Sequence, residues 1–321
     1  MSTRARAKET TAMRVAVVDT WGGIEGVARQ ERPDPTPAAE QVLIRVHGVG
    51  VGPWDVGFVG GGAPWLTLPF VPGFEVAGIV EEAADGADVQ PGDRVYASLW
   101  PDGGGLAESA LASVGRVAPM PEGLSFPEAA SLVIAGGTAH EGLIDRGRLE
   151  AGDRVLIVAA AGGVGSLAVQ IAVAVGAIPF GVASPRNHEY LRALGVSEVF
   201  DYHVAGWAQQ VLAAAPGGVD MLFDLAGGQT KDQAIAAVRD GGRVISVVPP
   251  FDRVPLERGI TSESFAAYVG RQRLEALSRF VAAGRLRPQV EAVLPFDQVR
   301  EALGRVASRH TRGKVVVQIR Q

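Results

Sequence analysis

The stretch from Val155 to Pro185 contains no charged residue. It is long enough to cross a bilayer as a helix. Small and helix-breaking residues interrupt it, however, and divide it into an apolar run, a turn, an apolar helix and a second apolar run. These residues are Gly162, Gly163, Gly165, Gly176, Pro179 and Gly181. A buried strand–turn–helix–strand unit explains the stretch better than a membrane span, so we expect no contact with a membrane.

The alternation of strand and helix continues beyond this unit. Apolar, β-branched runs predict strands at residues 155–159, 178–183, 198–201, 221–225 and 243–248. Helical patterns lie between them, at residues 164–175, 187–194, 206–215 and 230–239. Strands that alternate with helices predict right-handed βαβ units and a parallel sheet covered on both faces.

The two ends of the chain differ from this middle part. Up to about residue 130 the sequence is mainly β, with strands predicted at residues 14–19, 41–51, 75–82 and 94–98. At the other end, helices are predicted at residues 273–283 and 296–307, before a closing strand at residues 314–319. This strand could extend the parallel sheet or return to the first region. A chain of 321 residues agrees with two domains of about 150 residues each.

The turn inside the uncharged stretch carries an Ala-x-Gly-x-x-Gly pattern, formed by Ala160, Gly162 and Gly165. An isolated pattern of this kind would favour a glycine-rich turn without a ligand. Here it lies between a predicted strand and a predicted helix, which is the context of a dinucleotide-binding turn. Small residues let the backbone approach a pyrophosphate, and the free amides at the helix N-terminus supply hydrogen-bond donors.

The coenzyme is indicated by the residues that follow the second predicted strand. Folds specific for NAD usually place Asp or Glu there, about 20 residues beyond the glycines, to bind the ribose hydroxyls. This chain has Ser184 and Arg186 instead. A hydroxyl and a guanidinium suit a 2′-phosphate, which a carboxylate would repel, so NADP(H) is favoured over NAD(H). The alternative for Arg186 is a solvated charge at the start of a helix.

Several short motifs occur in an order that is more specific than the glycine pattern. They are Pro-Gly-Phe-Glu-Val-Ala-Gly at residues 72–78, Pro-Gly-Asp-Arg-Val at 91–95, Gly-Thr-Ala at 137–139, Gly-Gly-Arg-Val at 241–244 and Arg-Gly-Lys-Val at 312–315. With them, residues 13–319 resemble the zinc-independent branch of the medium-chain dehydrogenase/reductase superfamily, the quinone oxidoreductase-like proteins.

The resemblance implies an α/β fold with two domains and a cofactor cleft between them. Residues 13–129 and 267–321 would form a GroES-like, mainly β catalytic domain. Residues 130–266 would form a Rossmann domain, a doubly wound parallel sheet that binds NADP(H). Residues 1–12 would be a flexible leader. Relatives are commonly dimers, so a homodimer is expected by analogy.

The resemblance also implies a set of cofactor-binding residues. Thr138 would lie near the nicotinamide ribose, Ser184, Arg186 and Tyr202 about the 2′-phosphate, and Val247, Val248 and Pro249 along the nicotinamide. The glycine turn would contribute Ala161, Gly162, Gly163 and Val164, and Arg312, Gly313 and Lys314 would close the site from the C-terminal segment. By itself, Tyr202 is more typical of a packed aromatic at a strand end, and Lys314 of a solvated charge.

The residues that bind zinc in the metal-dependent relatives are missing. Those relatives have a cysteine where this chain has Gly52, and a histidine where it has Phe74. Neither residue offers a lone pair, and no cysteine occurs anywhere in the chain, so we expect no catalytic zinc. A quinone or enone accepts hydride at carbon and spreads the charge onto oxygen, which lessens the need for a metal.

The acid–base residues are less clear from the sequence. Quinone oxidoreductases commonly have an asparagine where this chain has Gly52, and the tyrosine proposed as a proton donor in related enoyl reductases is absent. The candidates that remain are Asp55, His140 and Tyr268. Asp55 could orient the substrate or cap a loop, and His140 could donate a proton or pack as a neutral side chain.

Three aromatic residues follow the same loop and could contact the substrate. Trp54, Phe58 and Trp65 would form a wall suited to a flat acceptor, and the alternative is ordinary packing of an apolar loop.

Composition excludes several other classes of protein. With 47% hydrophobic residues the chain is globular rather than disordered. A net charge of −5 without a long basic run argues against a nucleic-acid partner. Zero cysteines exclude a disulfide framework and an iron–sulfur cluster. Residues 1–12 are polar and lack the apolar segment of a secretory signal, so we expect a cytoplasmic protein.

These observations predict an NADPH-dependent reductase of quinones or α,β-unsaturated ketones that works without a metal. Two alternatives stay open. One is a tailoring enoyl reductase of a biosynthetic pathway, and the other is a non-catalytic NADPH-binding sensor or structural protein.

Overall fold

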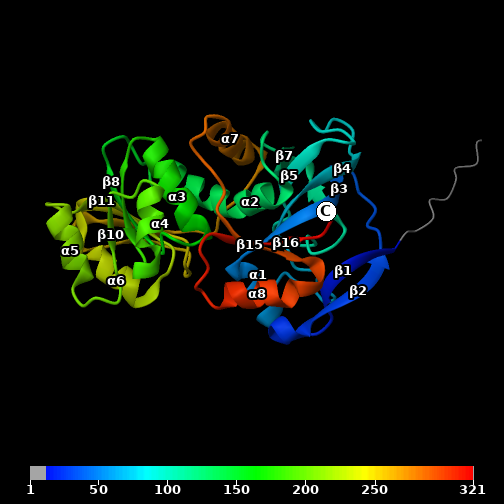
Figure 1. The fold of residues 1–321 in the computed structure, drawn as a ribbon, viewed down its shortest axis with the longest axis horizontal. Coiled ribbons are helices and arrows are strands. Elements are labelled where there is room, and N and C mark those ends of the chain that lie inside the picture. The colour runs from blue at the N-terminus through cyan, green and yellow to red at the C-terminus, as the bar shows by residue number, and fades with distance from the viewer. Residues whose placement is uncertain (1–11, 321) are drawn as a thin grey trace, which may run out of the picture.

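The computed structural model describes residues 12–320, which form two seven-stranded sheets and a two-stranded ribbon. Figure 1 shows the sheets toward opposite ends of an elongated molecule, with helix α2 (Phe126–His140) between them. Apart from Ala12, which begins strand β1, the predicted leader lies outside the described residues. Within residues 12–320, no helix is long and apolar enough to cross a membrane.

The middle of the chain builds a sheet with the order β10-β9-β8-β11-β12-β14-β13. The first six strands are parallel, and β13 pairs antiparallel with β14 at the edge. The strands are β8 (Arg154–Val158), β9 (Ile178–Val182), β10 (Glu198–Phe200), β11 (Val219–Asp224), β12 (Val238–Ser246), β13 (Arg253–Pro255) and β14 (Thr261–Ser264). The parallel strands follow the 3-2-1-4-5-6 order of the doubly wound Rossmann fold, which confirms the predicted architecture.

Consecutive residues of β8 point to opposite faces of this sheet. Val155 and Ile157 pack in a core that includes Leu167 of α3, whereas Leu156 and Val158 pack in a second core with Trp207 of α5. The covering helices are α3 (Gly163–Ala174), α4 (His188–Ala193), α5 (Trp207–Ala214) and α6 (Gly228–Ile235). Burial on both faces explains why the strand is apolar throughout instead of alternating.

The second sheet combines both ends of the chain in the order β15-β16-β3-β4-β5-β7, with β6 also paired to β3. Its strands are β3 (Gln41–Val51), β4 (Glu75–Ala83), β5 (Arg94–Ser98), β6 (Ser109–Ser113), β7 (Val117–Pro119), β15 (Val290–Pro295) and β16 (Lys314–Gln318). The closing strand β16 pairs antiparallel with β3, with Val316 opposite Gly50. Of the two alternatives, the strand therefore returns to the first region.

Shorter elements complete the structure. The ribbon is formed by β1 (Ala12–Val18) and β2 (Val27–Pro33), and the remaining α-helices are α1 (Pro53–Gly61), α7 (Arg271–Ala282) and α8 (Val299–Ala307). The 3₁₀ segments are η1 (Gly23–Gly26), η2 (Val114–Arg116), η4 (Pro185–Asn187), η5 (Glu257–Gly259) and η6 (Phe296–Gln298).

One predicted helix ends earlier than the sequence pattern indicates. The prediction extends to residue 239, but α6 ends at Ile235 and β12 begins at Val238. Val238 is buried and pairs with Val219 of β11. A buried β-branched residue in a strand ladder is more stable there than in a further helical turn.

The chain passes between the two sheets twice, and both crossings meet at Glu141. The first crossing is α2, which continues into a π-helical segment, η3 (Glu141–Arg146). The second is residues 265–270, where the Tyr268 amide donates to Glu141 at 3.0 Å. Arg146 and Arg273 pair with the same carboxylate at 2.7 and 3.2 Å. The proposed boundary near residue 267 lies at this junction, whereas the one near residue 130 lies toward the other end of α2.

We predict that Glu141→Gln destabilises the fold. Glu141 is only 4% exposed, and the substitution leaves two partly buried arginines without their shared carboxylate. The expected loss is about 1–3 kcal/mol, seen as a lower midpoint of thermal unfolding. The control is Glu301→Gln, which breaks an exposed pair with Arg305 and should change stability by at most about 0.5 kcal/mol. Equal midpoints for the two variants would contradict this role of Glu141.

Candidate functional site

The glycine turn connects β8 to α3 with very little free space. A Cβ atom on Gly165 would lie 2.4 Å from the Ala159 carbonyl oxygen. A Cβ atom on Gly163 would lie 2.6 Å from Cδ of Lys314. Helix α3 begins at Gly163, so its first amides point into the space beside the turn. The turn joins a strand to a helix as the dinucleotide pattern predicts, and phosphate binding by the first amides of α3 stays a prediction.

The C-terminal segment closes against this turn. The Gly313 amide donates to the Ala161 carbonyl at 2.9 Å, and Gly162 and Gly313 form a parallel bridge. The Lys314 side chain lies against Gly163 and is only 5% exposed, so Lys314 is not a solvated charge. Gly162, Gly163, Gly313 and Lys314, predicted as cofactor residues, are therefore neighbours in space.

Lys314 forms a buried ion pair with Glu75 of β4. Its Nζ also donates to the Val51 carbonyl at 2.9 Å and lies 4.8 Å from the centre of the Trp54 ring. Glu75 is fully buried and accepts from the Ile134 amide at 2.8 Å. Burial raises the pKa of Glu75, and the Lys314 charge opposes that shift. The pair thus connects β3, β4, α2 and the glycine turn.

Asp55 is buried at the start of α1. One carboxylate oxygen accepts from the Gly52 amide and the other from the Gly73 amide, both at 2.9 Å. Burial is the largest effect on its pKa and raises it to about 7, against the two amide donors, which lower it. Both oxygens have backbone partners, so Asp55 holds the loop before α1 against the loop before β4.

The predicted nicotinamide segment, residues 247–249, follows β12 and is supported by two buried polar residues. Asp224, at the end of β11, accepts from the Ser246 hydroxyl at 2.7 Å and from the Gly227 amide at 2.9 Å. The Val248 amide in turn donates to the Ser246 oxygen at 3.2 Å. Sequence reasoning missed Asp224 and Ser246, although a carboxylate at the end of an apolar strand was a usable signal. The segment lies at the carboxyl ends of the strands, where open α/β sheets bind ligands.

The candidate 2′-phosphate residues follow β9 and β10. The Ser184 Oγ accepts from the Asn187 side-chain amide at 3.3 Å. Arg186 donates to the His310 carbonyl at 2.7 Å. Tyr202 is 40% exposed and its ring centre lies 4.0 Å from that of His203, so it is not a packed core aromatic. Thr138, by contrast, is buried within α2.

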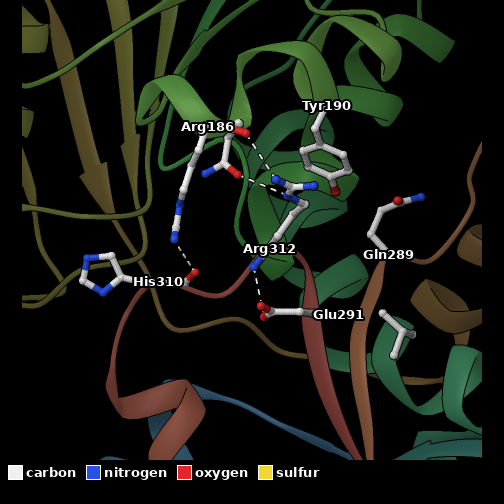
Figure 2. A pocket seen from close by; sticks show the side chains of 8 residues that line it. Arg186, Tyr190, Gln289, Glu291, His310 and Arg312 are labelled. Atoms are coloured by element: carbon white, nitrogen blue, oxygen red, sulfur yellow. Dashed lines mark hydrogen bonds between the residues drawn. The ribbon is translucent and has the colours of Figure 1, made fainter.

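A pocket of about 310 Å³ lies beside this loop (Figure 2). Its lining comes from η4, α4, β15 and the segment before β16: Arg186, Asn187, Tyr190, Gln289, Val290, Glu291, His310 and Arg312. Figure 2 shows the Arg312 side chain between Glu291 and the loop that carries Arg186.

The aromatic residues expected to contact substrate divide into two groups. Phe58 lies 6.1 Å from Trp65 and 5.6 Å from Trp100 between ring centres, and Phe74 lies 5.3 Å from Trp100. Trp54 stands apart, over Lys314. Sequence reasoning missed Trp100, because no spacing links it to the loop of Phe58. A second pocket of about 280 Å³ opens beside Trp65.

His140 and Tyr268 lie near each other but are not joined to Asp55 by any described contact. Arg273 approaches Nδ1 of His140 at 3.4 Å and donates to the Tyr268 carbonyl at 2.9 Å. Burial is the main effect that lowers the pKa of His140, which favours the neutral imidazole at pH 7. The Tyr268 side chain is 56% exposed beneath the Arg116 guanidinium.

Comparison with known proteins agrees with this architecture. Residues 38–122 match the family "Alcohol dehydrogenase GroES-like domain", and residues 194–317 match "Zinc-binding dehydrogenase". The chain is 32% identical to the quinone oxidoreductase of Homo sapiens over 310 residues, covering 90% of this chain and 92% of that protein. It is 31% identical to the chloroplastic NADPH-dependent alkenal/one oxidoreductase of Arabidopsis thaliana, covering 95% and 79%.

Solved structures show the same likeness. The quinone oxidoreductase from Coxiella burnetii superposes with a TM-score of 0.88 at 30% identity, covering 97% of this chain and 100% of that one. The expected GroES-like and Rossmann folds are both confirmed, and the relatives support an oxidoreductase that uses a nicotinamide cofactor. The chain therefore belongs to the medium-chain dehydrogenase/reductase superfamily, in its quinone oxidoreductase-like branch.

Proposed function

We propose that the protein transfers hydride from NADPH to a quinone or an α,β-unsaturated ketone without a metal. The observation that carries the NADPH assignment is the pair Ser184 and Arg186 at the end of the second parallel strand. NADPH is oxidised to NADP⁺, the acceptor takes up a hydride at carbon, and one proton completes the reduction. Quinone and alkenal/one reductases among the relatives support this class of acceptor.

The residues present fit a dinucleotide. The amides at the start of α3 would bind the pyrophosphate, beside the place where the Lys314 side chain packs against Gly163. Ser184, Arg186 and Tyr202 would bind the 2′-phosphate, Thr138 the nicotinamide ribose, and residues 247–249 would lie along the nicotinamide. Arg312, Gly313 and Lys314 would close the site. When bound, the reduced nicotinamide supplies the hydride.

The residues do not fit a catalytic zinc, although one matching family is described as zinc-binding. Gly52 and Phe74 stand where the resemblance places zinc ligands. A Cβ atom on Gly52 would lie 2.2 Å from the Trp54 ring, so the indole fills the space that a ligand side chain would need. Residues 12–320 contain no group of three His, Cys, Asp or Glu side chains placed to hold a metal.

Orientation and exclusion of water are the contributions we assign to the protein. Phe58, Trp65 and Trp100 would stack on a flat acceptor. Asp55 would act by fixing the loop before α1, since both of its oxygens have backbone partners. His140 and Tyr268 are the candidate proton donors, and otherwise solvent supplies the proton.

The two alternatives differ from this proposal in measurable ways. A tailoring enoyl reductase is favoured by the aromatic group around Trp100 and by similarity to the CurK enoyl reductase structure (28% identity, TM-score 0.85, covering 96% of this chain and 99% of that one). A non-catalytic sensor would bind NADPH without turnover. A homodimer is also a proposal, based on family analogy alone. The cytoplasmic location expected from the sequence stays a prediction.

The proposed reaction is tested by anaerobic oxidation of NADPH, followed by its absorbance, with naphthoquinones, cyclic enones and simple aldehydes. We expect turnover with the conjugated acceptors and little with the aldehydes, and a higher kcat/KM with NADPH than with NADH. Preference for one large enone over all quinones would favour the tailoring reductase. Tight NADPH binding without turnover across the panel would contradict the proposed activity.

Coenzyme choice is tested by placing a carboxylate where the 2′-phosphate would bind. We expect Ser184→Asp to lower kcat/KM for NADPH by about tenfold or more, through like-charge repulsion, and to change kcat/KM for NADH much less. The matched control is Ser197→Asp, which adds the same charge just before β10, at the amino ends of the strands, whereas Ser184 follows the carboxyl end of β9. Similar losses with both coenzymes in the Ser184 variant would argue against a 2′-phosphate site.

Asp55 predicts a pH-dependent contribution to stability. Its pKa is raised from 3.8 to about 7 in the folded protein, so its contribution is full below about pH 4 and is lost as the pH rises to about 7. Asp55→Asn removes this titration. Thermal unfolding of both proteins at pH 5 and pH 8 should show that the wild type's advantage over the variant is smaller at pH 8. An advantage that stays constant or grows with pH is the opposite result.

A further inference from the structure

Two arginines cross the seam between the Rossmann sheet and the C-terminal segment in opposite directions. Arg186, in η4, donates to the His310 carbonyl at 2.7 Å. Arg312, just before β16, donates through Nη2 to the Arg186 carbonyl at 3.2 Å. Figure 2 shows both bonds at the edge of the pocket. Each arginine thus uses backbone oxygen of the other segment, although the resemblance assigns both to the cofactor.

The Arg312 guanidinium has further partners within the protein. Nε donates to the Asn187 side-chain oxygen at 3.2 Å, and the guanidinium carbon lies 5.2 Å from the centre of the Tyr190 ring. The Arg312 backbone amide donates to the Glu291 carboxylate at 3.1 Å. The side chain is therefore oriented toward Asn187 and Tyr190, where it meets an acceptor and an aromatic face.

The Asn187 side chain lies between Arg312 and Ser184 and is hydrogen-bonded to both. Asn187 is 8% exposed, and its side-chain NH₂ donates to Ser184 Oγ at 3.3 Å. A guanidinium can only donate, so it requires the Asn187 oxygen on its own side. The NH₂ group then faces Ser184. Because Ser184 Oγ accepts this bond, its hydroxyl hydrogen stays available to donate outward.

The opposite orientation of Asn187 would have the opposite result. With its oxygen toward Ser184, the amide would accept the hydroxyl hydrogen, and Ser184 would present only lone pairs to an anion. Lone pairs repel a phosphate oxygen, whereas an O–H group binds it. The direction of one hydroxyl hydrogen thus depends on the arginine across the seam.

We propose that Arg312 is a positioning residue for coenzyme selection, acting through Asn187 on the Ser184 hydroxyl rather than by contact with the 2′-phosphate. This inference rests on the proposed NADPH preference. It assigns Arg312 a role different from the direct cofactor contact that the resemblance implies. It also links recognition of the 2′-phosphate to the position of the C-terminal segment, which carries Gly313 and Lys314 to the glycine turn.

The test is a double-mutant cycle on coenzyme binding, read from the fluorescence of NADPH and NADH so that no acceptor is needed. We expect Arg312→Gln to raise the Kd for NADPH by about five- to tenfold, the worth of one hydrogen bond, and the Kd for NADH by less than about twofold. Arg312→Lys should restore part of the NADPH affinity, since an ammonium can also donate to Asn187.

The second arm uses Asn187→Ala, which removes the side chain that links Arg312 to Ser184. In that background Arg312→Gln should change the NADPH Kd by less than about twofold. A full effect there would show direct contact with the phosphate and overturn the proposal. An Arg312→Gln variant that loses affinity for NADPH and NADH equally would also overturn the proposal, because it would indicate a merely structural role. Arg305→Gln, which breaks an exposed pair on α8, is the matched control.

The outcome separates this inference from the proposed function. A wild-type protein that binds NADPH and NADH equally contradicts the NADPH assignment and the inference together. A wild type that prefers NADPH, with an Arg312→Gln variant that keeps the full preference, contradicts the inference alone. Absence of turnover bears only on the proposed reaction, because binding is measured without it.

Discussion

The packing of the glycine turn against the second sheet depends most on Lys314. Its aliphatic stem lies against Gly163 of the dinucleotide turn, and its ammonium group reaches Glu75 and the Val51 carbonyl in the other sheet. A buried ion pair contributes little net stability after desolvation, but removing one partner leaves an uncompensated charge. The pair therefore fixes the position of the turn relative to the second sheet more than it stabilises the fold. A shorter side chain at position 314 would leave Glu75 buried without a counter-charge.

Glu141 plays a similar part at the other junction. Its carboxylate accepts a hydrogen bond from the Tyr268 amide and pairs with Arg146 and Arg273. These contacts lie where the chain leaves the second sheet and where it returns to it. The contacts of Lys314 hold the glycine turn, and the contacts of Glu141 hold both segments that cross between the sheets. Hydride transfer requires the donor and acceptor carbons to be held in a narrow range of distance and orientation. Glu75 and Glu141, each satisfied by donors from distant segments, would give the proposed site that definition.

Local signals were enough to predict the Rossmann sheet, because apolar runs, glycine turns and helix patterns are each read within about 15 residues. The glycine turn and the Ser184 loop were found for the same reason. The contacts that could not be predicted from the sequence are those between residues far apart in the chain. Glu75 and Lys314 are 239 residues apart, and Asn187 and Arg312 are 125 apart, so no spacing pairs them. The family resemblance placed Lys314 at the cofactor, but only the fold shows its buried counter-ion.

The same long-range contacts bear on the proposal that the site works without a Lewis acid. Trp54 folds over the position that a ligand at residue 52 would use, and its ring lies against the Lys314 ammonium. Such a ring stabilises a cation that already has a carboxylate partner. In the metal-free proposal, the neutralised pair of Lys314 and Glu75 stands in place of a metal. Without a metal to polarise a simple carbonyl, the proposed acceptor would have to delocalise the negative charge that hydride addition creates. Conjugated ketones and quinones do this within their own structure.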